Sequence, residues 1–269
     1  MNLPKKCAYC GNPGPFSREH VWPECFLNQL KDRYAHYSPK SGKVHGGDYV
    51  VRDVCLSCNN QKLSKLDNYF CSLYDLYFKN TRGSDEVVVF EYEYDLLARA
   101  LLKIAFNTAR SAGSETEPLE QMAGYILEGS PRPRGLAVIG ELVSPTYIED
   151  RSRPISVMKE IRPTLYRSAL GLLRAPHSFA VLVRIVAINS FFFHILVSRE
   201  SENIDSFFDA VREFLGGIRG TVLLSETHNH IVLRTSPQDS ISSMLPLISA
   251  KKFEYRRFFD SDKGSRKGG

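Results

Sequence analysis

The pattern of apolar and polar positions changes near residue 59 of the chain. Before it, short apolar runs alternate with glycine, proline and polar residues, which predicts strands at residues 16–22 and 49–54. The polar, glycine-rich stretch between them, residues 34–47, is predicted to be a loop. After residue 59, apolar residues recur at helical spacing on one face: Leu63, Leu66, Phe70, Leu73 and Tyr77. The first part of the chain therefore predicts two short strands followed by a helix.

A second region follows residues 81–85, where the sequence Thr-Arg-Gly-Ser-Asp ends the helical pattern and indicates a linker. A weakly alternating strand is predicted at residues 87–92 and a loop at residues 131–135. Runs rich in β-branched and aromatic residues predict further strands at residues 137–139, 178–187, 190–198, 221–225 and 230–234.

Two amphipathic helices are predicted among these strands, at residues 95–110 and 204–215. The apolar stripe of the first consists of Leu97, Leu101, Ile104, Ala105 and Thr108. The second is predicted to turn Phe207, Phe208, Val211 and Leu215 inward. The expected fold class is α+β, with a small N-terminal module over residues 1–80 and a larger α+β domain over residues 86–260. Residues 261–269 are rich in glycine, serine and lysine and are expected to be disordered.

Composition and charge narrow the class of protein. Apolar residues make up 43% and charged residues 24% of the chain, as in soluble globular proteins. No apolar run is long enough to span a bilayer, and the N-terminus lacks the apolar core of a signal peptide. We therefore expect a cytoplasmic protein with no membrane contact, in which paired cysteines favour metal over disulfides. The net charge of +5 permits an acidic partner such as nucleic acid.

Four of the six cysteines form two pairs of identical spacing, Cys7 with Cys10 and Cys55 with Cys58. Two such pairs supply the four thiolates of a tetrahedral structural zinc site. Gly11 follows the first pair, as expected for a tight turn that directs backbone amides toward sulfur. The gap of 44 residues between the pairs suits a site that closes a long loop. Cys25 and Cys71 have no such partner, and we expect both to be small core residues.

Candidate catalytic residues lie inside and directly after this cysteine framework. Ser17-Arg18-Glu19-His20-Val21-Trp22-Pro23 lies between the pairs, and Asn59-Asn60-Gln61-Lys62 follows the second pair at the start of the predicted helix. The combined order resembles the HNH endonucleases, in the subset whose ββα-metal motif is held together by a four-cysteine zinc. The resemblance covers residues 5 to about 72. It implies a treble-clef-like ββα-metal module.

The resemblance also implies roles for individual residues. His20 is the expected general base, because a neutral imidazole can take a proton from water near pH 7. Glu19 and Asn59 are the expected ligands of a catalytic Mg²⁺ or Mn²⁺, since hard cations prefer oxygen donors. Lys62 and Arg18 are candidate contacts to nucleic acid, although Lys62 is equally well explained as an exposed, solvated lysine.

The sequence leaves open which residues complete the catalytic site around His20. The resembled family more often has aspartate where this chain has Glu19, and the longer side chain changes the reach to a metal ion. Asp48 and His45 are both candidates for the residue that orients His20, and Asn60 is an alternative to Asn59. Adjacent strand residues point to opposite faces, so Glu19 and His20 converge only if the strand ends or bulges there.

The expected function is a metal-dependent endonuclease that hydrolyses phosphodiester bonds, with DNA favoured over RNA and a bacterial restriction or anti-phage role implied by the resemblance. The alternative is a non-catalytic zinc-containing module that binds nucleic acid or docks a protein partner such as an ATPase. Strand preference and oligomeric state stay open. Other histidines are weaker candidates: His36 and His45 near the catalytic metal, His228 and His230 in a turn, and His177 and His194 as satisfied structural residues. Residues 251–259 mix basic and aromatic residues, which fits either a base-stacking surface or the closing element of the domain.

Overall fold

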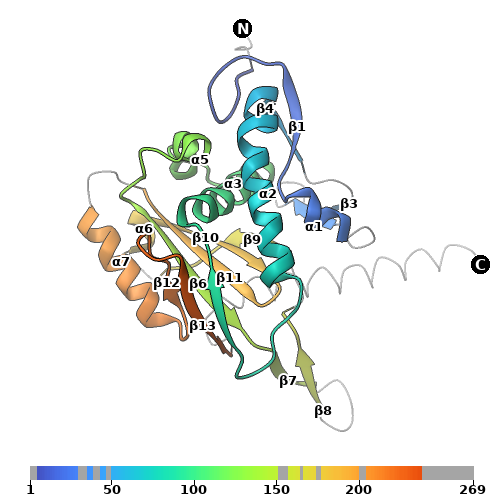
Figure 1. The fold of residues 1–269 in the computed structure, drawn as a ribbon, viewed down its shortest axis with the longest axis vertical. Helices are drawn as coiled ribbons and strands as arrows, with labels where there is room; N and C mark the ends of the chain where they lie inside the picture. Colours follow the sequence, from blue (N-terminus) through green and yellow to red (C-terminus); the bar gives the residue numbers. More distant parts are fainter. Residues whose placement is uncertain are drawn as a thin grey trace, which may run out of the picture.

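A computed structural model of the chain describes residues 5–29, 35–38, 43–46, 50–150, 157–163, 166–173, 177–199 and 204–237. The expectations for residues 251–259 and 261–269 lie outside this part of the chain. Within it, no helix combines the length and the apolar character needed to cross a bilayer. The structure has an α+β fold, as the sequence predicts, with helices packed around a mixed sheet (Figure 1).

The central sheet has seven strands in the order β5-β13-β6-β11-β10-β9, with β12 pairing to β6 (Figure 1). The strands are β5 (Val87–Glu91), β6 (Leu136–Val143), β9 (Tyr166–Leu170), β10 (Val181–Ile188), β11 (Phe191–Ser198), β12 (Val222–Leu223) and β13 (His230–Ser236). All neighbours run antiparallel except β13 and β6, which run parallel. A separate hairpin is formed by β7 (Thr146–Asp150) and β8 (Val157–Ile161).

The longest strands are buried on both faces, which explains their nearly continuous apolar sequence. Strands β10 and β11 form a hairpin whose two-residue turn contains Asn189 at φ 49°, a backbone conformation that asparagine tolerates well. Two strand predictions were too long. Residues 177–180 form helix α6 (His177–Ala180) ahead of β10, and only two of residues 221–225 are in strand β12.

Helix α3 (Tyr94–Ala112) crosses one face of the sheet and lies at the centre of the molecule. Thirteen of its nineteen residues are buried, including all five of the predicted apolar stripe, so the buried surface is wider than that stripe. The sheet covers one side of α3, and helices α2 (Ser64–Leu73) and α5 (Ala123–Glu128) pack on others. The helix ends at Gly113, whose φ of 65° is favourable for glycine. Helix α4 (Glu117–Glu120) follows it.

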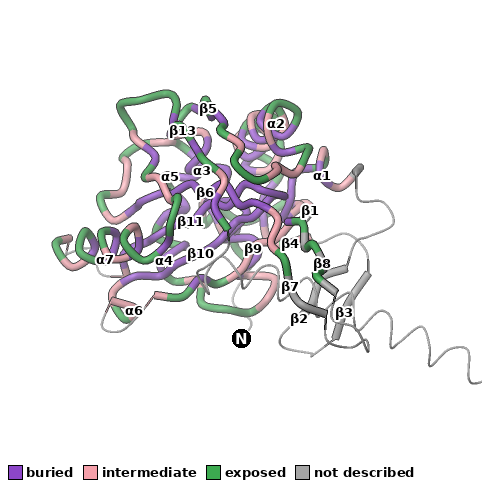
Figure 2. Tube along the Cα trace, turned by 90° about the horizontal axis from the view of Figure 1, so that it is seen from below, coloured by how far each residue is buried: buried purple, intermediate pink, exposed green. Residues whose placement is uncertain are grey.

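Helix α7 (Ile204–Gly217) covers the opposite face of the sheet, so that purple buried strands lie between α7 and α3 in Figure 2. Phe207, Ala210, Val211 and Phe214 are the buried residues of this helix. Phe208, which was predicted to point inward, is 48% exposed. The prediction was wrong because Phe207 and Phe208 are 100° apart around the helix, and Phe207 faces the sheet.

The N-terminal part consists of a two-stranded antiparallel sheet followed by a long helical segment (Figure 1). Its strands are β1 (Phe16–His20) and β4 (Val50–Cys55). The helical segment runs through η1 (Cys58–Leu63), α2 and η2 (Tyr74–Phe78), where η1 and η2 are π-helical turns. Helix α1 (Glu24–Gln29) lies between the strands. Within residues 34–47, which were predicted to be a loop, β2 (Ala35–Ser38) pairs antiparallel with β3 (Lys43–Gly46).

Buried side chains from both sides of residues 81–85 belong to one hydrophobic cluster. Phe26 packs on Phe70 with ring centroids 5.5 Å apart, and Phe70 packs on Phe78 at 5.7 Å. Phe78 in turn contacts Phe191 of the central sheet at 5.0 Å. The N-terminal part therefore shares its core with the sheet, and the division into two domains at residues 81–85 stays a prediction.

Replacing Phe78 with alanine is expected to lower the free energy of unfolding by about 3–5 kcal/mol, because a fully buried phenylalanine leaves a large cavity. The measurement is chemical denaturation followed by circular dichroism. Phe208→Ala is the matched control, since this side chain is half exposed and is expected to cost less than about 1 kcal/mol. Equal losses in the two variants would contradict the shared core described above.

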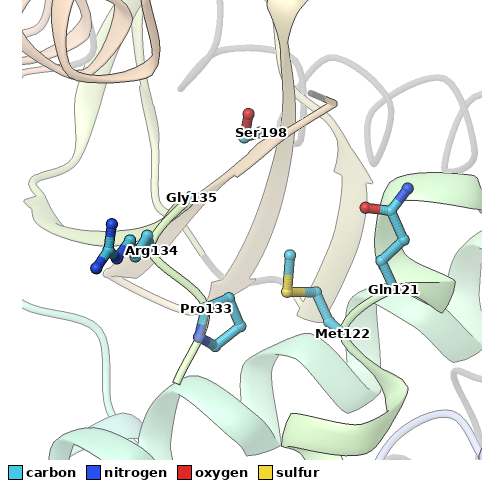
Figure 3. A pocket seen from close by; sticks show the side chains of 6 residues that line it. All are labelled: Gln121, Met122, Pro133, Arg134, Gly135 and Ser198. Carbon is cyan, nitrogen blue, oxygen red and sulfur yellow. The ribbon is translucent and has the colours of Figure 1, made fainter. Parts of the chain in front are cut away.

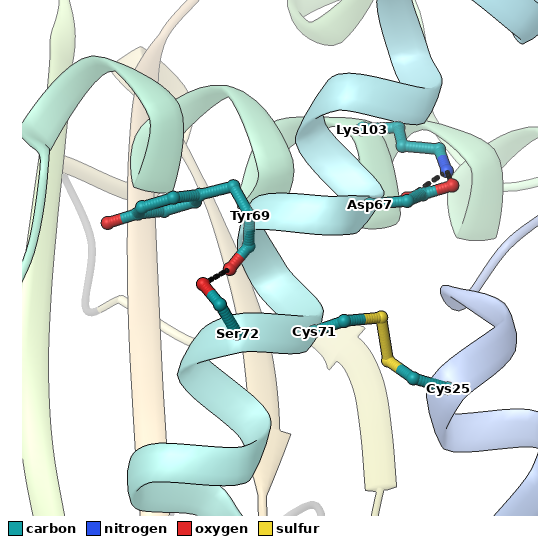
Figure 4. The surroundings of a disulfide bond; sticks show 6 residues. All are labelled: Cys25, Asp67, Tyr69, Cys71, Ser72 and Lys103. Carbon is teal, nitrogen blue, oxygen red and sulfur yellow. Dashed lines mark hydrogen bonds and ion pairs between the residues drawn. A yellow bond between two sulfur atoms is a disulfide. The ribbon is translucent and has the colours of Figure 1, made fainter.

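Cys25 and Cys71 form a disulfide bond between α1 and α2 (Figure 4). The sequence predicted two small core residues outside the CxxC pairs; they are instead bonded to each other and half buried. Sequence spacing could not pair them, because they are 46 residues apart and meet only when α1 folds back onto α2. Under the loop-entropy account, closing a loop of this length stabilises the folded chain by about 4 kcal/mol.

Variants that lack this bond are expected to unfold at a lower denaturant concentration than the wild-type protein. Cys25→Ala combined with Cys71→Ala removes the bond without leaving a single reactive thiol. Non-reducing peptide mapping of the wild-type chain should recover one peptide pair that joins Cys25 to Cys71. Recovery of both residues as free thiols would contradict the assignment.

Candidate functional site

The sulfur atoms of Cys7, Cys10, Cys55 and Cys58 all lie within 4.8 Å of one another. The Sγ atoms of Cys10 and Cys55 are 3.7 Å apart. Four sulfurs at about 2.3 Å from a tetrahedral zinc ion are separated from each other by about 3.8 Å, so the group fits zinc in donor type and size. The two predicted cysteine pairs therefore come together as one group that can hold a metal ion.

Backbone geometry around the first cysteine pair supports metal binding. Gly11 has a φ of 72°, and its amide donates to the carbonyl of Cys7 at 2.9 Å, which closes the turn. The amide of Cys55 donates to the Sγ atom of Cys7 at 3.4 Å. Burial raises the pKa of the Cys7 thiol, but backbone amides of Cys55, Cys10 and Tyr9 together lower it to about 7. Burial and the neighbouring thiols raise the pKa of Cys58, so these sulfurs do not all ionise easily without a cation.

Strand β1 ends at the Glu19-His20 pair. The pairing register between β1 and β4 shifts between Ser17 and Glu19, and His20 lies opposite Val50 as the last residue of the strand. The strand therefore ends at this pair, which is one of the two conditions predicted. The irregular step lies before the pair, at residue 18, and Glu19 and His20 are in regular register with residues 51 and 50. The two side chains differ in environment: His20 is half buried, whereas Glu19 is 2% exposed.

Asn59 connects the start of the helical segment to β1. Its side-chain amide donates to the hydroxyl of Ser17 at 2.9 Å and to the backbone carbonyl of Arg18 at 3.1 Å. These contacts place Asn59 beside the two residues that precede Glu19 and His20. Asn60 is exposed, and its backbone carbonyl accepts a hydrogen bond from Ser64. Of the two asparagines, Asn59 is therefore the one whose side chain lies against the strand that carries His20.

The carboxylate of Glu19 is ion-paired with Lys103 of α3. The Lys103 Nζ atom lies 2.5 Å from Glu19 Oε1, and 2.5 and 2.7 Å from the two carboxylate oxygens of Asp67 (Figure 4 shows the Asp67 contact). Burial lowers the pKa of Lys103, but Asp67 and Glu19 raise it above its usual value, so the ammonium stays charged. Burial raises the pKa of Glu19, and Lys103 offsets this only in part. A divalent ion bound by Glu19 would share this carboxylate with Lys103.

A second polar group of α3 lies beside the first. The hydroxyl of Tyr9, in the first cysteine turn, donates to Asn107 Oδ1 at 2.7 Å, and the Asn107 amide lies 3.5 Å from the backbone carbonyl of His20. Arg110 donates to the same Asn107 oxygen at 3.0 Å and also pairs with Asp53 of β4. Sequence reasoning missed these residues. The available signal is the spacing of the polar positions 103, 107 and 110 on one side of the helix, although the helix also has polar residues elsewhere.

The two predicted nucleic-acid contacts differ in their surroundings. Lys62 forms an ion pair with Glu128 of α5. Arg18 is exposed and lies at the irregular step of β1, opposite residues 52 and 53. The ammonium of Lys5 donates to the backbone carbonyl of Arg52, so these two cations are neighbours, and both are exposed.

The remaining histidine candidates are placed as follows. The side chains of His36 and His45 and the whole of Asp48 lie outside the described residues, so the residue that orients His20 stays a prediction. His194 is buried and its Nε2 atom lies 2.8 Å from Glu141, and His177 lies 3.2 Å from Glu213, so each has a carboxylate partner; their purely structural role stays a prediction. His228 lies in an exposed turn and His230 begins β13.

A surface depression of about 310 Å³ lies away from these residues (Figure 3). It is lined by Gln121, Met122, Pro133, Arg134, Gly135 and Ser198. Figure 3 shows Met122 pointing toward its centre and the Arg134 side chain pointing outward. The lining offers one cation and no carboxylate or histidine, so it does not provide the groups needed for acid–base or metal chemistry.

No protein-family model matches the chain, and comparisons with curated proteins and with solved structures find no match either.

Proposed function

We propose that the chain is a metal-dependent endonuclease of the HNH type that hydrolyses phosphodiester bonds in nucleic acid. One observation carries the proposal. His20 ends the first of two antiparallel strands, and the side chain of Asn59, at the start of the following helical segment, is hydrogen-bonded to that same strand. The four cysteines, which belong to the same strands and turns, fix these elements relative to one another. The arrangement supports a treble-clef-like ββα-metal module held together by structural zinc.

His20 is the proposed general base. It lies at the end of β1 and is half buried, so its imidazole has access to a water molecule and is also held by the fold. The side-chain oxygen of Asn59 and the carboxylate of Glu19 are the proposed ligands for Mg²⁺ or Mn²⁺, because both are hard oxygen donors. When bound, such an ion would neutralise phosphate charge and stabilise the leaving oxygen.

The charge distribution supports nucleic acid as the substrate. Glu19, Asp53 and Asp67 of the N-terminal part are all paired with cations from α3, namely Lys103 and Arg110. This pairing neutralises three acidic groups of the N-terminal part, whose exposed cations include Lys5, Lys6, Arg18, Arg52 and Lys65. Exposed cations of this kind bind the phosphate backbone, and we propose DNA as the favoured substrate in a cytoplasmic restriction or anti-phage context.

The proposal is tested by incubating the purified chain with plasmid DNA, single-stranded DNA and RNA, with Mg²⁺, with Mn²⁺ and with a chelator. We expect cleavage of at least one substrate in the presence of a divalent ion and none in chelator. A chain that retains its zinc but cleaves no substrate under any of these conditions would contradict the proposal. The panel also identifies the substrate class.

A second candidate is a zinc-containing module that binds nucleic acid without cutting it. The ion pair between Glu19 and Lys103 favours this alternative, because it engages the carboxylate expected to hold the catalytic ion. Such a module would bind nucleic acid equally well in Mg²⁺ and in a chelator of Mg²⁺, and would never nick it. A gel-shift assay run beside the cleavage assay separates the two functions.

A further inference from the structure

We propose that helix α3 positions the Glu19-His20 pair for catalysis, with Lys103 holding the side chain of Glu19 and Asn107 holding the main chain at His20. The proposal rests on the proposed nuclease function. Lys103 and Asn107 are positioning residues in this account. If α3 acts in this way, the part of the chain after residue 85 belongs to the nuclease site and does not serve only to select the target.

The spacing of the contacts supports this role. Lys103 and Asn107 are four residues apart, so they project from the same side of α3 about one turn apart. Their contacts, Glu19 Oε1 at 2.5 Å and the carbonyl of His20 at 3.5 Å, belong to consecutive residues of β1. The helix thus contacts both members of the dipeptide, one through its side chain and the other through its backbone.

Burial makes these contacts difficult to replace. Lys103 and Asn107 are both 0% exposed, so neither can exchange its partner for bulk water. Lys103 also binds Asp67 of α2, which joins β1, α2 and α3 through one ammonium group. Unlike a surface ion pair, such a buried arrangement restricts the conformations that its members can adopt.

Asn107 also links His20 to the metal-binding group. Its Oδ1 atom accepts the hydroxyl of Tyr9, which lies between Cys7 and Cys10, while its amide reaches the carbonyl of His20. Arg110 supports the same oxygen at 3.0 Å and pairs with Asp53, two residues before Cys55. Adjacent turns of α3 therefore contact three elements at once: the first cysteine turn, β4 and the end of β1.

The test compares Asn107→Asp with Thr108→Val in the full-length chain. Aspartate keeps an acceptor for Tyr9 and Arg110 but loses the amide donor that reaches His20. Thr108 is the matched control, because it is buried on the same helix and its hydroxyl bonds only within α3, to the carbonyl of Ile104. For Asn107→Asp we expect kcat to fall by about 10–100-fold, as for other supporting residues of metal sites, with KM nearly unchanged.

A second variant examines Lys103. Lys103→Gln is made together with Asp67→Asn, so that the ammonium and one of its two carboxylate partners are removed together. We expect the same loss of kcat in this double variant. Circular dichroism and zinc content identify any variant that fails to fold. If the double variant fails to fold, the conclusion is drawn from Asn107→Asp.

The second readout is the NMR signal of the His20 imidazole, identified by its absence in His20→Ala. We expect this signal to move or broaden in Asn107→Asp and to stay unchanged in Thr108→Val. Wild-type kcat and an unmoved His20 signal in Asn107→Asp would overturn the proposal. If the wild-type chain cleaves nothing, the proposed nuclease function is rejected. The NMR signal of His20 still shows in that case whether Asn107 of α3 positions this residue.

Discussion

Replacing His20 with alanine is expected to reduce divalent-ion-dependent cleavage by about 10²–10⁴-fold, the usual contribution of a general base. His20 is the only residue of the proposed site that can take a proton from water near neutral pH, since Asn59 does not titrate and Glu19 is paired with Lys103. The measurement is the initial rate of plasmid nicking at saturating Mg²⁺. The loss should appear mainly in kcat, because alanine leaves the exposed cations that bind the substrate in place.

The control for this variant is His228→Ala, which removes an exposed histidine from a turn outside the proposed site. It should cleave at the wild-type rate. Zinc content and the thermal midpoint should be the same in His20→Ala, His228→Ala and wild-type protein. A His20→Ala protein that cleaves as fast as His228→Ala would remove His20 from the mechanism.

Replacing Cys58 with serine is expected to remove the zinc and unfold the N-terminal part of the chain. Zinc bound to four cysteine or histidine ligands contributes about 10–16 kcal/mol in small peptides, so losing one of four thiolates is a large change. Cys58 is 2% exposed and begins the helical segment that carries Asn59, so the consequence reaches the proposed active site. The measurement is zinc per chain by elemental analysis, with hydrogen exchange over residues 5–29 and 50–78.

The matched control is the chain in which Cys25 and Cys71 are both replaced with serine. These residues form the disulfide and lie outside the four-cysteine group, so this variant should retain one zinc per chain despite its lower stability. Equal zinc content in Cys58→Ser and in wild-type protein would show that the four sulfurs do not bind zinc together.

The features that the sequence predicted best are those with local signals. The two cysteine pairs have identical spacing, and the structure brings all four sulfurs together. For the Glu19-His20 pair the sequence required either a strand end or a bulge, and β1 does end at His20. Helix α7 was predicted from periodicity alone, although the inclusion of Phe208 in its buried face was one position too wide.

The features that were missed depend on contacts between distant segments. The partner of Cys25 is Cys71, and only the packing of α1 on α2 brings them together. Helix α3 was predicted to be amphipathic from the helical spacing of its apolar residues. In the structure Lys103 and Arg110 on its other side are also largely buried, because they pair with Glu19, Asp67 and Asp53, which come from segments distant in the sequence.

Chemical rescue tests whether His20 activates water for phosphodiester hydrolysis. The assay follows nicking of supercoiled plasmid by His20→Ala in Mg²⁺ while free imidazole is added, beside wild-type protein and a chelator control. We expect rapid nicking by the wild type, almost none by the variant, and partial recovery with imidazole that requires Mg²⁺. Wild-type nicking no faster than the chelator control, or equal rates in the variant and the wild type, would contradict this role of His20.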